Sequence, residues 1–556
     1  MAIRGEFEQA RDFLILHRAD YDYAFNQFKW PQLENFNWAL DYFDSMAEGN
    51  NNTALWIINE DGKEEKYSFA DLSARSGQVA NYLRKLGVHK GDSILLMVGN
   101  DTAYWEIMLA AMKLGAVVVP ASPYLSEAEL EDRLLRGRVR LVVTTKDHAD
   151  RFRFDSSSLI PLLVDGSMSG WHDYADATRE SASYEASEKT KATDAVLMYF
   201  TSSMAAKPKM VEHSYLSFTV GHLSSMFWMG LRPGDIHLGI SSPGWSMHDW
   251  NSFIAPWNAE ATIFVDHLSR LHGRFDAKIL LDTMEHYRIT TFCAPPSVWR
   301  KLLQEDLTQF QIPLREALST GEPLTEDIVE KVHQAWGLQI RDGFSQTETS
   351  MLIGVAPGQR AVPGSLGKPL PGYSIRLLDE AGKEVKEGEI CVEAAVLKTH
   401  PYHSGDVARI DKAGNYSYVG RNDALFKCSD YRISPFEIES VLLENPAVRE
   451  VAVIPSPDPI RYAVPKAIVV LAKGFEPTKE IAIDIMNYTR SRLAPFKRVR
   501  RVEFHDLLKG SDGTILRMEL IKKEQEKRQT NDKSLYEFWE EDARATLPET
   551  WAQDLP

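Results

Sequence analysis

The sequence predicts an α/β protein with a large N-terminal domain of parallel sheets and helices plus an antiparallel β subdomain, followed by a small α+β C-terminal domain. Buried apolar runs alternate with helical segments through the first two thirds of the chain, which is typical of parallel sheets covered by helices. Between Gly364 and Val419, short strand-like runs alternate with glycine turns, which indicates antiparallel strands. Helices and strands mix again beyond residue 423.

The first 50 residues are aromatic and polar, with helical spacing around Phe13, Leu14 and Leu16, and predict a leading helical cap. The turn Asp61-Gly62 between two apolar runs predicts a hairpin. The strands expected in the large domain are Ala54–Ile58, Lys66–Phe69, Ser93–Val98, Gly115–Pro120, Leu141–Thr144, Pro161–Val164, Val196–Met198, Asp235–Ile240, Ala261–Val265, Thr290–Cys293 and Leu338–Ile340. The remaining expected elements are helices Phe69–Leu86, Ala103–Leu114, Pro435–Glu444 and Lys479–Leu493, and strands Val448–Ile454 and Ala467–Leu471.

Composition excludes several functions. The 556 residues carry a formal net charge of -16, which argues against a nucleic-acid partner. Cys293, Cys391 and Cys428 are too far apart for a disulfide framework or a zinc-binding spacing, so we expect no metal site. The start of the chain lacks a signal-peptide core, and no apolar run approaches the roughly 20 residues of a membrane span. We therefore expect a cytoplasmic protein without a membrane partner.

One loop organises the rest of the chain. The apolar run Ala195–Met198 predicts a strand that opens into a Ser/Thr-rich segment ending at Lys209, which is where a nucleotide phosphate loop is expected. The loop contains no glycine, although backbone amides approach phosphates closely only where Cβ atoms are absent. The position of this segment after the strand thus predicts a phosphate loop, but its residues no longer suit phosphate binding.

The order of motifs resembles the adenylate-forming superfamily of acyl-CoA synthetases, in its medium-chain branch. Members form an acyl-adenylate from ATP and a carboxylate, rotate a small C-terminal domain, and let the CoA thiol displace AMP. The matching segments are Thr201-Ser202 with Pro208–Ser214, Pro243-Gly244-Trp245, Ser319–Leu324, Asp342–Glu348, His403–Asp406, Gly420-Arg421 and Lys427–Ile433. The resemblance implies a domain over residues 1–422 that binds the acyl group and AMP, a mobile small domain over 423–525 with its hinge at Asp423, and a helical tail over 526–556.

The resemblance also implies residue roles. Thr347, Arg421 and the magnesium-linked Glu348 are expected at the AMP phosphate, and Trp245 and Gly244 at the acyl pocket. Gly321, Glu322, Pro323, Asp342, Gly343, Phe344 and Asp406 are expected to bind AMP. A carboxylate such as Asp406 can accept two ribose hydroxyls, an aromatic ring such as Phe344 can stack on a purine, and a guanidinium beside a phosphate neutralises charge.

The departures from the family concentrate on adenylation. Where the family has two glycines with hydroxyl residues between them, this chain has Ser203, Met204, Ala205 and Ala206. Pyrophosphate binding and departure should suffer, because this chemistry depends on positioned donors. Thr514 occupies the position of the lysine that reaches the carboxylate and α-phosphate during adenylation. Both losses affect formation of the adenylate, whereas the residues that would hold AMP remain.

Two further departures affect the second half-reaction. Asp430 replaces the hairpin glycine and could act as a base or repel CoA phosphates. The segment before His403 is shorter than the family's, which should open the mouth of the acyl pocket. The resemblance implies that CoA contacts Ser429, Asp430, Tyr431, Arg432, Arg461 and Lys497.

The leading hypothesis is a non-adenylating acyl-CoA ligase that takes a preformed acyl-adenylate, transfers the acyl group to CoA and releases AMP, without a requirement for Mg²⁺. It resembles the split ligases of antibiotic pathways, in which a companion ligase makes the adenylate. The alternatives are a complete ATP-dependent acyl-CoA synthetase, an acyl-adenylate:amine transferase and a non-catalytic adenylate-binding protein.

Overall fold

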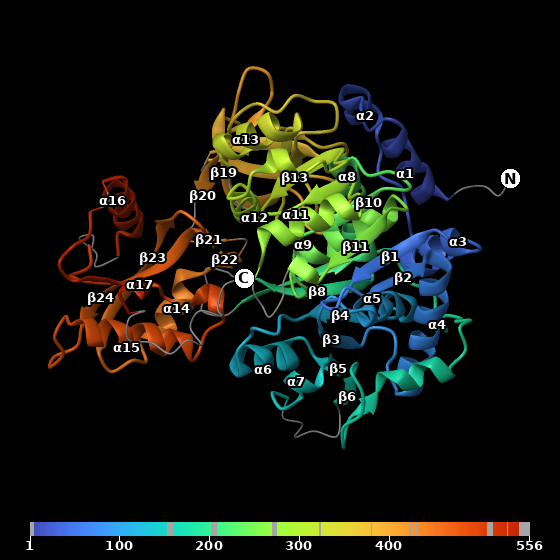
Figure 1. Ribbon diagram of the computed structural model, residues 1–556, viewed down its shortest axis with the longest axis horizontal. Coiled ribbons are helices and arrows are strands. Elements are labelled where there is room, and N and C mark those ends of the chain that lie inside the picture. Colours follow the sequence, from blue (N-terminus) through green and yellow to red (C-terminus); the bar gives the residue numbers. More distant parts are fainter. Residues whose placement is uncertain are drawn as a thin grey trace. The chain divides into compact units, whose positions relative to one another are not determined.

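The computed structural model describes residues 5–152, 159–201, 208–269, 275–321, 324–379, 381–421, 425–429, 431–508, 515–530 and 532–543. The chain divides into two compact units (Figure 1). The large unit comprises residues 1–123, 127–199 and 210–420, and the small unit comprises 124–126, 200–209 and 421–556.

One sheet of the large unit contains mainly parallel strands in the order β7-β6-β5-β3-β4-β8-β9. Its strands are β3 (Ser93–Met97), β4 (Val117–Pro120), β5 (Val139–Thr144), β6 (Ile160–Leu163), β7 (His172–Asp173), β8 (Ala195–Thr201) and β9 (Lys209–Ser214). All five side chains of β3 are buried, as expected for a parallel strand covered on both faces. The strand predicted at Val196–Met198 is β8, and Thr201, the first residue of the predicted loop, is the last of this strand.

The second sheet has the order β16-β15-β14-β13-β12-β10-β11-β1-β2. Its strands are β1 (Thr53–Ile58), β2 (Glu64–Ser68), β10 (Ile236–Gly239), β11 (Thr262–Asp266), β12 (Thr291–Cys293), β13 (Glu316–Thr320), β14 (Ile340–Phe344), β15 (Ile353–Gly354) and β16 (Lys368–Pro369). The pairs from β1 through β11, β10, β12 and β13 to β14 are parallel, and the predicted hairpin β1–β2 is antiparallel. The sequence did not predict β13, although it carries the segment before Gly321.

Helices cover these sheets. They are α1 (Glu6–Leu16), α2 (Tyr21–Gln27), α3 (Asp44–Ala47), α4 (Phe69–Lys85), α5 (Thr102–Leu114), α6 (Glu127–Arg136), α7 (Lys146–Ala149), α8 (Leu223–Met229), α9 (Ser246–Asp249), α10 (Ala255–Asn258), α11 (Ala277–His286), α12 (Pro296–Leu302) and α13 (Glu326–Trp336). One core includes Trp105, Trp228 and Trp257, and a second packs α11–α13 against the second sheet around Trp299. Figure 1 shows α11, α12 and α13 gathered over that sheet. Helices α1 and α2 form the predicted leading helical segment.

Helix α4 illustrates how the local sequence sets an element. Ser68 Oγ accepts a hydrogen bond from the Asp71 N–H at 3.0 Å, and the Asp71 carboxylate accepts one from the Ser68 N–H at 2.9 Å. This capping box satisfies donors of the first turn. The helix ends before Gly87, whose φ of +95° favours glycine. The expected strand end at Phe69 is wrong, because this cap makes Phe69 the first helical residue.

The predicted antiparallel subdomain is confirmed by a sheet of order β17-β18-β19-β20. Its strands are β17 (Ser374–Leu378), β18 (Glu387–Glu393), β19 (Tyr402–Ile410) and β20 (Tyr416–Arg421). The register of β18 and β19 shifts between the pairs Glu389–Val407 and Cys391–His403. Three residues of β19, including Gly405 and Asp406, therefore face one residue of β18. This β-bulge projects Asp406 out of the regular ladder.

The small unit is α+β. It contains the hairpin β21 (Phe426–Cys428) and β22 (Tyr431–Ile433), and a sheet of order β23-β24-β25-β26. The other elements are β23 (Val448–Asp458), β24 (Tyr462–Leu471), β25 (Arg501–Phe504), β26 (Glu537–Trp539), α14 (Pro435–Leu442), α15 (Lys479–Arg490), α16 (Arg517–Gln529) and α17 (Glu540–Ala543). The predicted helical tail is partly wrong, since β26 pairs antiparallel with β25. A three-residue strand is too short to show a periodicity in the sequence.

Candidate active site

Two of the predicted AMP-binding segments lie at the carboxyl ends of strands β13 and β14 in the second sheet. Strands β13 and β14 are parallel, and Thr320 lies opposite Gly343. The Thr320 hydroxyl donates a 2.7 Å hydrogen bond to the Gly343 carbonyl. Gly321 follows β13 with φ of +97°, so the chain turns there in a conformation that favours glycine. Ligands of parallel α/β sheets bind at such carboxyl ends.

Gly343 is required by packing. A Cβ at this position would lie 2.7 Å from the Trp228 ring and 2.8 Å from Met351 Sδ. The neighbouring Asp342 is buried, and its Oδ1 accepts a 2.8 Å hydrogen bond from the Gly343 N–H. Burial raises the pKa of Asp342 to about 8. Asp342 is therefore a neutral hydrogen-bonding group at neutral pH in the protein without ligand.

The turn that follows β14 carries Gln346, Thr347 and Glu348. His213 Nε2 donates a 2.7 Å hydrogen bond to the Thr347 carbonyl, and its Nδ1 lies 3.2 Å from Ser217 Oγ. Burial lowers the pKa of His213, so a neutral imidazole holds this turn. Ser246 Oγ lies 3.4 Å from Thr347 Oγ1. The structure thus brings the Thr347 turn beside the segment that contains Trp245.

The bulge of β19 places Asp406 beside the same turn. Asp406 is 4% exposed. The Gln346 side-chain amide donates to Asp406 Oδ2, and the Tyr418 hydroxyl donates to Oδ1 at 2.9 Å. A carboxylate accepts about four hydrogen bonds. Asp406 is therefore held in a fixed orientation by two neutral donors, which suits it to receive ligand hydroxyls.

Gln346 is the residue that links these parts. Its Nε2 also donates to the Ser404 carbonyl at 2.9 Å, and its Oε1 accepts from the Tyr402 hydroxyl at 2.5 Å. These partners fix which amide atom is oxygen. Gln346 belongs to the predicted segment Asp342–Glu348, but the sequence indicates no role for it, because a positioning amide has no signature of its own. Phe344 packs near Tyr418, with ring centroids 6.4 Å apart.

The segment Pro243–Trp245, which is expected at the acyl pocket, lies close to the backbone of Ser122. Gly244 has φ of +95°, and a Cβ there would lie 2.5 Å from the Ser122 nitrogen. Trp245 is half-buried and precedes α9, whose last residue is Asp249. Asp249 is fully buried between the hydroxyls of Tyr104 and Tyr199, the latter at 2.5 Å. Burial raises the pKa of Asp249 to about 7. No sequence motif predicts this cluster, which joins α5, β8 and α9.

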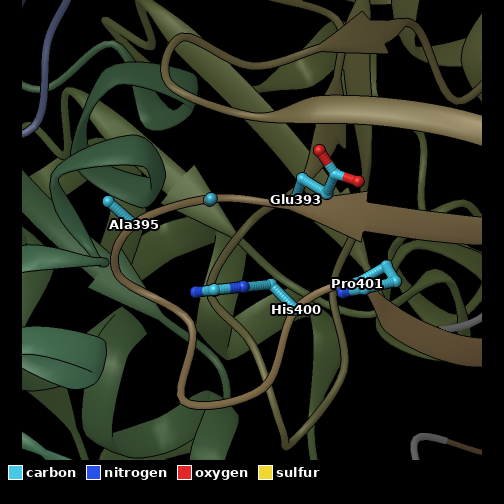
Figure 2. A pocket seen from close by; sticks show the side chains of 5 residues that line it. Glu393, Ala395, His400 and Pro401 are labelled. Atoms are coloured by element: carbon cyan, nitrogen blue, oxygen red, sulfur yellow. The ribbon is translucent and has the colours of Figure 1, made fainter.

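A hollow of about 490 Å³ lies where β18 runs into the connection to β19. Its lining residues are Glu393, Ala394, Ala395, His400 and Pro401 (Figure 2). This connection is the segment that is predicted to be shorter than the family's. Figure 2 shows His400 and Glu393 on opposite sides of the connection, with the Glu393 carboxylate directed away from His400.

The small unit carries the predicted CoA residues. Ser429 has φ of +50° and its N–H donates to the Arg461 carbonyl at 2.8 Å. The ring of Tyr431 stacks on Phe496 at 4.1 Å with an interplanar angle of 7°. Arg432 is half-buried on β22. Lys497 is 5% exposed, and its Nζ lies 2.6 Å from Glu437 Oε1, so this cation is already ion-paired.

Some predicted positions are described only in part. Arg421 ends β20 and is half-buried, and Lys209 begins β9. The remaining predicted residues lie outside the described residues: Ser202, Ser203, Met204, Ala205, Ala206, Glu322, Pro323, Asp423, Asp430 and Thr514. Among the helices of the described ranges, none combines the length and hydropathy needed to cross a bilayer.

Fold and site together define an adenylate-forming enzyme of the acyl-CoA ligase class. The model of the AMP-binding enzyme family matches residues 43–397, and that of the AMP-binding enzyme C-terminal domain matches residues 437–511. The chain therefore belongs to the AMP-binding enzyme family. Its relatives support a place among the medium-chain acyl-CoA synthetases of that family.

Two relatives match almost the whole chain. 4-Hydroxybutyrate–CoA ligase 1 of Metallosphaera sedula is 36% identical, over 91% of this chain and 94% of its own length. The human mitochondrial acyl-coenzyme A synthetase ACSM3 is 32% identical, over 91% and 92%. Among solved structures, an acyl-CoA synthetase of Brucella canis has a TM-score of 0.67 at 28% identity and covers 92% of this chain and 99% of its own.

Proposed function

We propose that this acyl-CoA ligase performs the thioester-forming half-reaction alone, with a preformed acyl-adenylate and CoA as substrates. The observation that carries the proposal is a difference between the residues expected at AMP and those expected at pyrophosphate. Residues predicted to hold AMP, from the Thr347 turn to Asp406, are positioned by hydrogen bonds. The pyrophosphate-side sequence has Ser203, Ala206 and Thr514 where the family has two glycines and a lysine.

The proposed chemistry needs positioning more than acid–base catalysis. The CoA thiolate attacks the acyl carbonyl, a carbon–sulfur bond forms, the carbon–oxygen bond to the phosphate breaks, and AMP leaves with the electron pair. The thiol proton passes to solvent. Asp406 would hold the ribose, and Thr347 with Arg421 would hold the phosphate that becomes the leaving group. Glu348 and Mg²⁺ would not be required for this step.

CoA is proposed to meet the hairpin of the small unit, at Ser429, Asp430, Tyr431 and Arg432, with Arg461 adding charge. The aromatic pair of Tyr431 and Phe496 offers a flat, rigid surface there. We further propose that a companion ligase supplies the adenylate and that the chain acts in the cytoplasm. In its departures the chain resembles the thioester-forming ligases of platensimycin and platencin biosynthesis, which would imply a bulky diterpenoid acid.

A second candidate is a complete ATP-dependent synthetase. It is favoured by the names of the relatives, which are a CoA ligase and an acyl-CoA synthetase matched over 94% and 92% of their length. The name of the first relative also suggests a small acid such as 4-hydroxybutyrate as the acyl group.

Two assays with the full chain distinguish the candidates. Purified protein is given acid, ATP and labelled pyrophosphate, and separately the synthetic acyl-adenylate with CoA. The acyl panel comprises 4-hydroxybutyrate, butyrate and a diterpenoid acid. We expect thioester and AMP from at least one adenylate and no ATP–pyrophosphate exchange with its acid. Robust exchange would favour the complete synthetase, and AMP release without thioester would favour transfer to an amine or to water.

A further inference from the structure

A cluster of three different ligand types lies on β18 and β19 of the large unit. Cys391 faces His403 across the two strands, and Glu389 precedes Cys391 by two residues on the same strand face. Cys391 Sγ lies 3.3 Å from His403 Nδ1, and Glu389 Oε2 lies 3.1 Å from the same nitrogen. All three ligand atoms lie within 4.8 Å of one another.

These separations match the needs of a small divalent ion. Zinc binds thiolate, imidazole and carboxylate ligands at about 2.0–2.3 Å in tetrahedral geometry, so its ligand atoms lie roughly 3.3–3.8 Å apart. The sulfur–nitrogen and nitrogen–oxygen distances of the cluster are close to this range. A thiolate and a carboxylate together carry two negative charges, which balance a divalent cation, while the imidazole is a neutral ligand.

The cluster is buried at Cys391 and open to solvent at His403. Cys391 is 3% exposed, whereas the His403 side chain is 55% exposed. Water can therefore reach the cluster beside the imidazole. Arg376 lies opposite Cys391 on β17, and its guanidinium is 2.6 Å from Glu393 Oε1. The nearby cation is thus paired with a carboxylate outside the cluster.

We propose that Glu389, Cys391 and His403 form a binding site for a divalent cation of the zinc type, with Oε2, Sγ and Nδ1 as protein ligands and water in the fourth position. Binding displaces the thiol proton: the Cys391 S–H bond breaks, a sulfur–metal bond forms and the proton leaves to solvent. A cysteine thiol is ordinarily protonated at neutral pH, whereas the metal ligand is the thiolate, so binding releases a proton.

The site would act on the bulge that carries Asp406. The second carboxylate oxygen of Glu389 accepts a 2.8 Å hydrogen bond from the Gly405 N–H. An ion that fixes Glu389 and His403 would thereby hold the segment Ser404–Asp406 at its start, through His403, and at its middle, through the Gly405 N–H. This consequence rests on the proposed function, in which Asp406 holds the ribose, whereas cation binding itself does not.

The test is a titration of the chelator-treated full chain with Co²⁺, a spectroscopic substitute for Zn²⁺. We expect one equivalent to bind, with a thiolate-to-cobalt charge-transfer band, release of one proton and displacement by Zn²⁺. Cys391→Ser should abolish the band. His403→Gln changes an exposed side chain and should weaken binding about 10-fold or more. Cys293→Ser, a buried cysteine on β12, is the matched control and should leave the band unchanged.

Loss of the band in Cys391→Ser, with Cys293→Ser unaffected, supports the site. A titration without stoichiometric binding, or a band that survives in Cys391→Ser, overturns it. Thermal melting of each variant establishes folding, and Zn²⁺ should raise the melting temperature of the parent by more than that of His403→Gln. These readouts use neither CoA nor an adenylate, so failure of the cation site and failure of the proposed function remain distinguishable.

Discussion

The residues predicted to bind AMP in the large unit and those predicted to bind CoA in the small unit hold their charged groups differently. Asp406 is oriented by the neutral donors Gln346 and Tyr418. Lys497, predicted for the CoA side, is buried against the Glu437 carboxylate at 2.6 Å. A motif therefore predicts where a residue lies, whereas its neighbours decide whether its charge serves a ligand or the fold.

The largest expected effect concerns the AMP side. Asp406→Asn keeps the shape of the side chain but replaces a charged acceptor with an amide. Loss of two charge-assisted hydrogen bonds to ribose should lower kcat/KM for the acyl-adenylate by about 100-fold. Steady-state thioester formation measures this. Gln346→Glu, which removes a donor to Asp406, should act in the same direction, and a kcat/KM unchanged in Asp406→Asn would refute the ribose assignment.

The CoA side gives the next effect. Lys497→Met leaves Glu437 as a buried, unpaired carboxylate and should lower the free energy of unfolding by about 3 kcal/mol. The double variant Lys497→Met with Glu437→Leu should recover most of this loss, as measured by urea denaturation. We expect its KM for CoA to stay close to that of the parent. A tenfold higher KM in the stable double variant would show instead that Lys497 serves CoA.

A third prediction concerns the pyrophosphate side. Ser203→Gly, Met204→Thr, Ala205→Thr and Ala206→Gly, combined with Thr514→Lys, restore the family's loop and lysine. We expect ATP–pyrophosphate exchange to rise about 10-fold or more above the parent, because amides can again approach the phosphates. The four loop changes without Thr514→Lys are the control and should give less. No exchange in the repaired chain, despite turnover of the adenylate, would mean that other residues also block adenylation.

The last predicted effect is a pH dependence. The folded chain keeps the Asp342 proton up to a pKa of about 8, whereas the unfolded chain loses it near 4. Between these values the unfolded state binds fewer protons, so stability falls as pH rises. In Asp342→Asn, the free energy of unfolding should decline less steeply with pH, by up to about 1.4 kcal/mol per pH unit. Urea denaturation of both proteins at about pH 5 and pH 7.5 tests it, and equal slopes would contradict the neutral buried acid.

Much of the fold could be predicted because its signals are local. The apolar runs of β3, β4 and β10 and the turns of the antiparallel subdomain appear directly in the sequence. Strand β13 was missed because Glu316–Thr320 is short and mixed in polarity, and its burial comes from neighbouring strands. The three-residue strand β26 was missed because only its pairing with β25 defines it.

The site was predictable where a motif carries it. Asp406, Thr347 and Phe344 come from recognisable segments, whereas the roles of His213 and Gln346 depend on contacts with residues far away in the sequence. Cys391 and His403 likewise meet only through the register of β18 and β19. Their spacing of twelve residues fits no metal motif, so the expectation of no metal site conflicts with the proposed cation site, which the cobalt titration decides.

The most direct test of the central claim is a ratio of two turnover rates. CoA-thioester formation from the synthetic acyl-adenylate is compared with formation from the same acid plus ATP and Mg²⁺, using the acyl group that turns over best. We predict turnover from the adenylate and none above background from acid and ATP. Comparable rates from both sources would contradict the account and establish a complete synthetase.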